Sequence, residues 1–316
     1  MTKKLPLVIA AMMLVGFTYS QSIQRPNFLK KDSIQSTLDK NTQVFYYDKS
    51  TSSKAKPLVV ELHSWSNTAD SQKEILAEQA HTKNWNYILP NFRGVNNHLK
   101  ACCSQFVISD IDEAIDWALK YMKVDKTNIY IIGNSGGGYA AMAMYMKSRH
   151  NIRAFSAWSS ISDLATWYEE SVERKNKYAA EIIQCTNANG IFDDQKARER
   201  SPLFWETPIK KRRNSILQIY AGIHDGYTGS VPISQSIKFY NKLLIDTDET
   251  DDAKYVSYDD TSTMLKTQSF PLTKPVKKID NRAIFYQKSS KKITITIFEG
   301  THEILKNVAL DLIDNL

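Results

Sequence analysis

The stretch that most constrains the fold is Gly133-Asn134-Ser135-Gly136-Gly137. An apolar run, Ile129 to Ile132, precedes it, and an alanine- and methionine-rich run, Gly138 to Met146, follows it. This pattern predicts a buried strand, a tight turn and a buried helix, the context in which a G-x-S-x-G turn presents a nucleophilic serine. The glycines let the chain reverse without clashes, so that Ser135 is held in a strained conformation above the sheet edge. The alternative interpretation is a glycine-rich turn that only ends a buried strand.

Strands alternate with helices along most of the chain, which predicts an α/β fold with a doubly wound, mostly parallel sheet. Residues 162–205 are polar and partly helical, and we expect them to form a lid-like insertion over the carboxyl edge of the sheet. Residues 246–281 are expected to be a polar connector. The expected strands are Gln43 to Tyr47 (an edge strand), Pro57 to Leu62, Tyr87 to Pro90, Ile129 to Ile132, Ala154 to Trp158, Ile216 to Tyr220, and a hairpin from Asn281 to Phe298. Other expected helices are Ala69 to His81, Gln105 to Met122, Pro232 to Ile245, and a last one that ends near Ile313.

A serine nucleophile needs a base, and the base needs a carboxylate that orients it. Asp225 follows the strand that comes after the insertion, and His302 follows the last strand. Both lie in turns that contain glycine, and serine, acid and histidine come in the order that this kind of fold uses. We therefore predict a catalytic triad of Ser135, Asp225 and His302. Asp163 is a rival acid, and we expect the neighbouring His224 to point away.

The carbonyl oxygen that becomes negative during acyl transfer needs two N–H donors. Gly136 is expected to supply one, because its N–H faces the site and the positive end of the following helix lies there. The second should come from the loop after Leu62, from the backbone of Trp65 or of Ser64.

The amino terminus has the features of a secretory signal peptide, residues 1–20. Lys3 and Lys4 precede an apolar run, Leu5 to Phe17, that is too short to span a bilayer, and small residues favour cleavage after Ser20. An uncleaved membrane anchor is the alternative. We expect residues 21–316 to form one domain that is periplasmic or secreted, with no stable membrane insertion after cleavage.

Net charge bears on the binding partners that can be expected, and the cysteines bear on disulfide formation. Without Lys3 and Lys4 the formal net charge falls from +7 to +5, and the densest basic cluster, Lys210 to Arg213, is interpreted as a solvated turn. This argues against a nucleic-acid partner. We expect no cofactor and no metal. An export signal permits a disulfide, and with three cysteines one is left over; Cys185 is expected to pair with Cys102 or Cys103.

The motifs resemble the α/β-hydrolase superfamily, and within it the catalytic domain of the prolyl oligopeptidase group. The resemblance covers Pro57 to the end, and it is carried by the serine turn, Asn91-Phe92-Arg93-Gly94, Ser201-Pro202-Leu203, Gly222-Ile223-His224-Asp225 and Gly300-Thr301-His302-Glu303. It implies a serine hydrolase with Ser135, Asp225 and His302 as its triad.

The substrate expectation departs from that group. Its peptidases carry a large amino-terminal propeller, for which the residues before Pro57 leave no room, so the compact layout is similar to secreted carbohydrate esterases such as acetyl xylan or feruloyl esterases. We therefore expect hydrolysis of an acyl ester on a polysaccharide or oligosaccharide, with a small-molecule or carbohydrate ester as the substrate. The alternatives are a serine peptidase of the prolyl oligopeptidase type and a binding module on an inactive scaffold. The expected substrate-binding residues are Tyr139, Trp158, Trp167 and Tyr227 as aromatic faces, and Arg93 for an acidic group or, alternatively, for a lid carboxylate.

Overall fold

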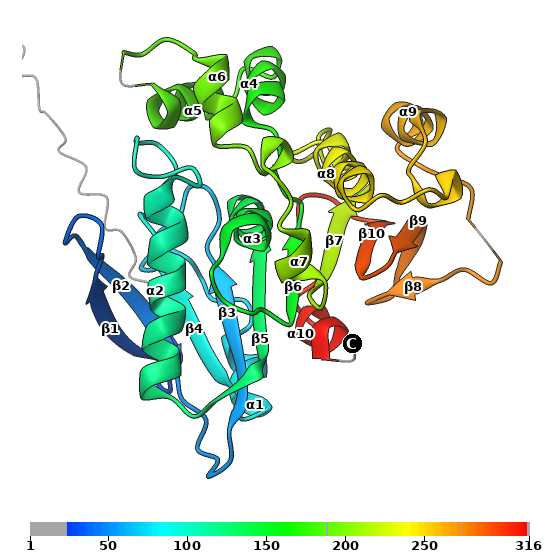
Figure 1. The fold of residues 1–316 in the computed structure, drawn as a ribbon. Helices are drawn as coiled ribbons and strands as arrows, with labels where there is room; N and C mark the ends of the chain where they lie inside the picture. Colours follow the sequence, from blue (N-terminus) through cyan, green and yellow to red (C-terminus); the bar gives the residue numbers. More distant parts are fainter. Residues whose placement is uncertain (1–23, 188, 273, 315–316) are drawn as a thin grey trace, which may run out of the picture.

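The computed structural model describes residues 24–187, 189–272 and 274–314, and it is organised around a 10-stranded sheet (Figure 1). The expected signal peptide lies outside the described residues. Among the described residues, no helix has the length and apolar character needed to cross a membrane.

The sheet is parallel at its centre and antiparallel at both ends. Its strand order is β1-β2-β4-β3-β5-β6-β7-β10-β9-β8; the strands from β4 to β10 in this order pair in parallel, and the outer pairs are antiparallel. The central strands are buried on both faces, which explains their nearly continuous apolar sequences. The bounds are β1 Lys30–Gln35, β2 Thr42–Asp48, β3 Lys56–Leu62, β4 Asn86–Pro90, β5 Val124–Asn134, β6 Ala154–Trp158, β7 Ile216–Gly222, β8 Lys278–Ile279, β9 Arg282–Ser290 and β10 Ile293–Phe298.

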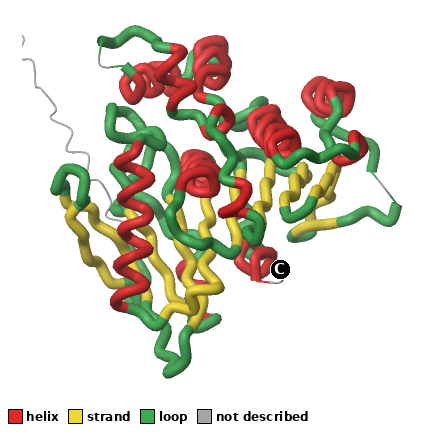
Figure 2. Tube along the Cα trace, in the orientation of Figure 1, coloured by secondary structure: helices red, strands yellow, loops and turns green. Residues whose placement is uncertain are grey.

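Helices cover both faces of the sheet, as the doubly wound prediction requires (Figures 1 and 2). The helices α2 (Gln105–Tyr121), α3 (Gly136–Lys147) and α8 (Ile233–Asp246) share one apolar core with the sheet. The helices α1 (Ala77–Thr82) and α10 (Ala309–Asp314) share the core on the opposite face. The fold therefore presents the carboxyl ends of its parallel strands along one edge, where binding sites of open α/β sheets form.

The insertion between β6 and β7 is helical, as expected, and lies beyond that edge at the top of Figure 1. It contains α4 (Leu164–Glu173), α5 (Tyr178–Thr186), α6 (Asp194–Glu199) and a 3₁₀ turn, η1 (Pro202–Phe204). We call α4 to α6 the lid. Asp163 caps α4, because its carboxylate accepts hydrogen bonds from Ala165 N and Thr166 N, both at 3.1 Å.

Three local expectations need correction. The outermost strand is β1, not the strand at residues 42–48. The β1 sequence is mostly exposed and does not alternate apolar with polar residues, so it gave no strand signal. The helix expected from Ala69 is confined to α1. The polar connector holds a 3₁₀ turn, η2 (Asp252–Lys254), and a helix, α9 (Tyr258–Thr267), which buries only Met264 and so lacks an apolar stripe.

The basic cluster is also not a plain solvated turn. It forms α7 (Ile209–Arg212), and Arg212 is buried against the carboxyl end of α3. Its guanidinium donates to carbonyl oxygens that α3 leaves unpaired, at 2.6 Å for Tyr145 and 2.8 Å for Ser148. Burial lowers the pKa of Arg212 to about 10. This side chain therefore fastens the helix that follows Ser135.

Candidate active site

Ser135 lies at the sharp turn between β5 and α3, with φ 57° and ψ −119°. A side chain at Gly133 would place its Cβ 2.2 Å from the carbonyl oxygen of Gly137, so only glycine fits that position. The strained serine and the crossing backbone are the features that the G-x-S-x-G pattern predicted. The turn therefore presents Ser135 at the carboxyl edge of the sheet, between the strands and the lid.

Asp225 and His302 meet at the same edge. Asp225 follows β7, His302 follows β10, and these strands are parallel neighbours whose last residues pair. The Nδ1 atom of His302 lies 2.8 Å from Oδ2 of Asp225. The other carboxylate oxygen accepts hydrogen bonds from the backbone N–H groups of Gly226 at 2.9 Å and Val231 at 3.1 Å. Asp225 is thus buried and fixed, and it holds the imidazole of His302 by Nδ1.

The two competing side chains have other contacts. Asp163 caps α4, as described above, which removes it as the orienting acid. His224 turns away, as expected: its Nδ1 lies 3.2 Å from Gln268 Oε1 and its Nε2 lies 3.8 Å from Glu299 Oε1.

The two expected oxyanion donors come from segments in direct contact. A Cβ placed on Gly136 would lie 2.3 Å from the backbone nitrogen of Trp65, so the loop after β3 packs against the start of α3. Of the two candidates in that loop, Ser64 is already engaged, because its N–H donates to Gln72 Oε1 at 3.2 Å. The geometry therefore favours Trp65 as the partner of Gly136.

A buried carboxylate supports the same loop from inside the sheet. Glu61, in β3, accepts hydrogen bonds from the backbone N–H groups of Ile75 at 2.8 Å and Leu76 at 2.9 Å, and from the hydroxyl of Tyr87 at 2.8 Å. Burial raises the pKa of the Glu61 carboxyl to about 7 despite these three donors. This pKa makes the support of the segment before α1 dependent on pH.

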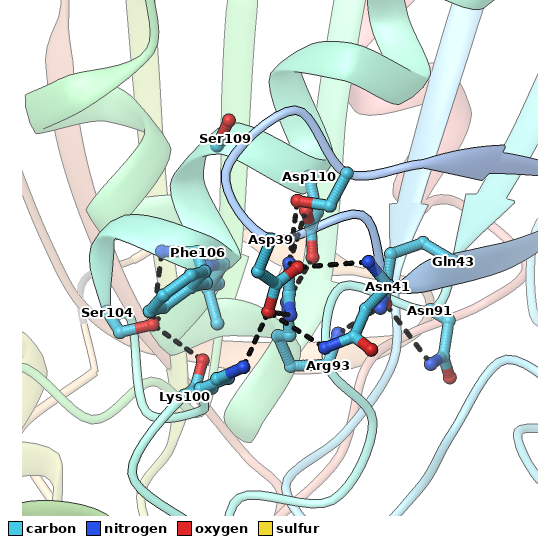
Figure 3. A network of polar contacts seen from close by, with 12 residues as sticks. Asp39, Asn41, Gln43, Asn91, Arg93, Lys100, Ser104, Phe106, Ser109 and Asp110 are labelled. Atoms are coloured by element: carbon cyan, nitrogen blue, oxygen red, sulfur yellow. Dashed lines mark hydrogen bonds and ion pairs between the residues drawn. The ribbon is translucent and has the colours of Figure 1, made fainter.

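Arg93, an expected substrate contact, belongs instead to a buried ion-pair network (Figure 3). Its Nε lies 2.5 Å from Asp110 in α2, and its Nη1 lies 2.7 Å from Asp39 in the β1–β2 turn. The Arg93 side chain is only 2% exposed. Hydrogen bonds from Arg93, and then from Lys100, hold the pKa of Asp39 well below its usual range. The network joins the turn of the first hairpin to α2 and to the segment after β4. Neither carboxylate comes from the lid, and the buried Arg93 is not a substrate contact.

Two of the four aromatic residues expected to contact the substrate are buried away from it. Tyr139 is buried and its hydroxyl donates to backbone oxygens of Cys102 and Arg200. Trp158 is buried in the core of the α1 and α10 face, stacked on Tyr220. Neither offers a face to a substrate. A position at the end of a strand predicts that a residue lies at the carboxyl edge of the sheet, but it does not predict where the side chain points.

Trp167 is also too buried to offer a face to a substrate, and of the four expected aromatic residues Tyr227 is the exposed one. Trp167, in α4, is buried, and its indole N–H donates to Ser230 O in the loop after Asp225, at 2.9 Å. Tyr227 is 53% exposed, and its hydroxyl contacts Leu265 O in α9. These contacts join the lid and α9 to the turn that carries the acid.

The disulfide joins Cys102 to Cys185, the first of the two expected pairings, at a sequence separation of 83. Cys103 is free and buried, and burial raises the pKa of its thiol. The bridge fastens lid helix α5 to the loop before α2. Within the described ranges, no group of three or more His, Cys, Asp or Glu side chains is arranged to hold a metal ion.

Three residues that contact the Trp65 loop were not predicted. Gln72 binds the loop at Ser64, Asn96 N donates to Trp65 O at 2.9 Å, and Glu181 accepts from the Trp65 indole. They come from segments far apart in the sequence, and no local spacing marks them.

Comparison with solved structures finds a similar fold in part of several larger proteins. The Pyrococcus horikoshii acylaminoacyl peptidase aligns with a TM-score of 0.55 at 18% identity, over 70% of this chain and 36% of that one. A Mycobacterium tuberculosis puromycin-hydrolyzing peptidase aligns with a TM-score of 0.53 at 15% identity, over 76% of this chain and 37% of that one. Prolyl oligopeptidase B from Galerina marginata, bound to a 35mer hydrolysis and macrocyclization substrate, aligns with a TM-score of 0.53 at 15% identity. The alignment covers 71% of this chain and 32% of that one. The matched part of this chain thus corresponds to about a third of each of those chains, and the likeness shows the α/β-hydrolase fold.

The family comparison corrects the substrate expectation. No curated protein matches the sequence. The model of the prolyl oligopeptidase family matches residues 80–264, more than half of the chain, including the serine turn, the lid and the Asp225 turn. Because this family and the solved neighbours are peptidases, the expectation of an esterase that acts on polysaccharides is wrong. That expectation gave too much weight to the short segment before Pro57, which says nothing about the chemistry at Ser135. The chain is a serine hydrolase, and it belongs to the prolyl oligopeptidase family.

Proposed function

We propose that this protein is a serine peptidase that cleaves peptide amide bonds, with Ser135 as nucleophile, His302 as general base and acid, and Asp225 as the orienting carboxylate. The observation that carries the proposal is the 2.8 Å contact between His302 Nδ1 and Asp225 Oδ2, at the sheet edge where the Ser135 turn lies. Membership of the prolyl oligopeptidase family supports amide bonds as the substrate.

The reaction follows from the roles of these atoms. Ser135 Oγ attacks the peptide carbonyl carbon while His302 Nε2 takes the hydroxyl proton. The carbonyl oxygen becomes negative and faces the N–H groups of Gly136 and Trp65. When the C–N bond breaks, His302 returns the proton to the leaving amine. Water then attacks the acyl-enzyme, with His302 again as the base, and releases Ser135.

A panel of peptide amides tests the proposal. Solved neighbours are named acylaminoacyl peptidase and prolyl oligopeptidase, so the panel takes N-acylated short peptides, prolyl peptides and a long unstructured peptide. We expect at least one class to be cleaved by the wild type and none by Ser135→Ala. A preparation whose Ser135 reacts with a fluorophosphonate, yet which cleaves no peptide amide, would contradict the proposal.

We also infer that the protein is exported. The charged, apolar and small-residue segments of residues 1–20 support this, and so does the Cys102–Cys185 bridge, since disulfides persist in oxidising compartments. Expression in a bacterium with a periplasm, followed by fractionation and intact mass, tests it. We expect a periplasmic chain that begins at Gln21, and an unprocessed cytosolic chain would contradict it.

A further inference from the structure

Trp65 is attached to the lid by its side chain. The indole Nε1 donates to Glu181 Oε2 at 2.8 Å, and Glu181 lies in α5, at the top of Figure 1. The ring packs edge-on against Trp167, with centroids 4.8 Å apart, and against Tyr178. Trp65 is only 1% exposed. A hydrogen bond to a carboxylate is stronger than a neutral one, and exclusion of water strengthens it further.

The same carboxylate is itself held in place. Lys177, one turn earlier, lies 3.1 Å from Glu181 Oε1, and its ammonium also donates to Ser66 Oγ at 2.7 Å. Ser66 is the next residue after Trp65. The amino end of α5 therefore contacts the loop at two successive residues.

The backbone of Trp65 is held from the opposite side. Asn96 N donates to Trp65 O at 2.9 Å, and Asn96 Oδ1 accepts from Cys102 N at 2.7 Å. Cys102 is joined by the disulfide to Cys185, which lies one helical turn after Glu181 on α5. The connections form a closed ring that runs from Trp65 through Asn96, Cys102, Cys185 and Glu181 back to Trp65.

We propose that Glu181 is a positioning residue that keeps the Trp65 N–H aimed at the oxyanion by holding its indole. This inference rests on the proposed function, in which Trp65 N is one of the two donors. With the carbonyl and the side chain of Trp65 both fixed, its backbone keeps little freedom to turn the N–H away from Gly136. Without Glu181, the indole loses its acceptor and the loop can shift. A small displacement of a donor matters, since it stabilises only the charge that develops in the transition state.

The test compares Glu181→Ala and Glu181→Gln with Glu199→Ala, a control that removes an exposed ion pair elsewhere on the lid, with Lys196. We expect Glu181→Ala to lower kcat about 10- to 100-fold, since displaced catalytic groups cost up to about that much, with KM within about twofold because ground-state binding does not use the oxyanion. Glu181→Gln should keep kcat within about threefold, because its amide oxygen still accepts from the indole. An unchanged kcat in Glu181→Ala, a loss only through KM, or equal losses in both variants overturns the proposal.

Labelling of Ser135 separates this inference from the peptidase proposal. Attack on a fluorophosphonate also places negative charge on an oxygen at the oxyanion site and needs no peptide. If no peptide is cleaved but Glu181→Ala slows labelling by tenfold or more, the peptidase proposal fails and the role of Glu181 stands. If Glu181→Ala is labelled at the wild-type rate, the role of Glu181 is overturned whatever the peptide result.

A second variant keeps the test valid if Glu181→Ala also disturbs the fold. Trp65→Phe removes the indole donor but keeps an aromatic ring in the cluster with Trp167 and Tyr178. If Glu181 acts through the indole, Glu181→Ala should add almost nothing to the labelling defect of Trp65→Phe. Independent, multiplying effects in the double variant overturn the proposal.

Discussion

His302 and Asp225 are 77 positions apart in the sequence, yet His302 Nδ1 and Asp225 Oδ2 are 2.8 Å apart in the structure. Their strands pair in parallel up to Phe298 and Gly222, so both turns leave the sheet at the same level. The second oxygen of Asp225 is occupied by two backbone N–H groups, which leaves only Oδ2 to face the imidazole.

Asp225→Asn should therefore inactivate the enzyme without unfolding it. The amide oxygen of the variant can replace Oδ1 as the acceptor, which turns the NH₂ group toward His302 Nδ1 and favours the wrong tautomer. We expect kcat to fall by about 10⁴-fold, as measured on the best substrate of the peptide panel. Asp163→Asn is the matched control: asparagine also caps helices, so its activity should stay near wild type. Loss of activity in the control instead would make Asp163 the acid.

Ser135→Ala should abolish turnover, with a loss of about 10⁶-fold in kcat as for other serine nucleophiles. Its Tm should stay close to wild type, because relief of backbone strain at φ 57° is not expected from another side chain with a Cβ. Ser160→Ala is the control, since the Ser160 hydroxyl is buried near α3 and has no hydrogen-bond partner among the described residues. Normal activity in Ser135→Ala would remove it from the mechanism.

Glu61 should make stability fall as the pH rises from about 4.5 to about 7. The folded pKa is about 7 and the ordinary value is 4.5, so the folded state holds this proton more tightly. The contribution is fully present below pH 4.5 and is lost as the pH passes 7; the difference corresponds to about 3 kcal/mol. Urea unfolding of wild type and Glu61→Gln across this range measures it. We expect the wild-type free energy of unfolding to decline relative to the variant, and parallel profiles would contradict a raised pKa.

The disulfide should leave one thiol for alkylation in the denatured, unreduced protein and three after reduction, counted by intact mass. The single modified residue should be Cys103, as peptide mapping would show. Cys102→Ala/Cys185→Ala should lower the free energy of unfolding by about 2–4 kcal/mol, because the bridge closes a long loop in the unfolded chain. Three thiols without reductant would exclude the bridge.

Arg93→Ala should destabilise the protein and leave KM unchanged in the folded fraction. Removal of the guanidinium leaves Asp110, which is 1% exposed, without its charged partner, and a broken buried pair typically costs about 3–5 kcal/mol. Lys100→Ala removes the exposed partner of the same Asp39 and should cost less than about 1 kcal/mol. Chemical unfolding of both variants measures the difference. A raised KM with unchanged stability would return Arg93 to the substrate site.

Local sequence was enough to predict where the three residues of the candidate site lie in the fold. Gly133 is required because the backbone of Gly137 crosses it within the same turn, so this part of the pattern has a local cause, whereas Gly136 and Gly137 are required by the backbone that follows β3. Asp225 and His302 were predicted because strands alternate with helices and each acid or base follows a strand. The strands β3 and β6 were predicted nearly to the residue, since burial on both faces makes them continuously apolar. The strand β5 is longer than the expected Ile129 to Ile132, because it begins at Val124 in a polar stretch.

The sequence-based predictions were wrong for residues whose side chains contact segments far away in the sequence. Strand-end position placed Arg93 and Trp158 near the site, but side-chain direction buried them elsewhere. The outer strand β1 and the helix α9 bury few side chains, so neither carries an apolar period. The substrate class was also wrong, because it was argued from the length of one segment.

The attachment of the site to the lid was decided only by the tertiary structure. Periodicity reports which face of an element is buried, and turns report where the chain reverses. Neither reports which partner a side chain meets across 116 positions, as Trp65 meets Glu181. Such a contact depends on how two loops and a helix pack together, and that packing exists only when the whole chain is folded.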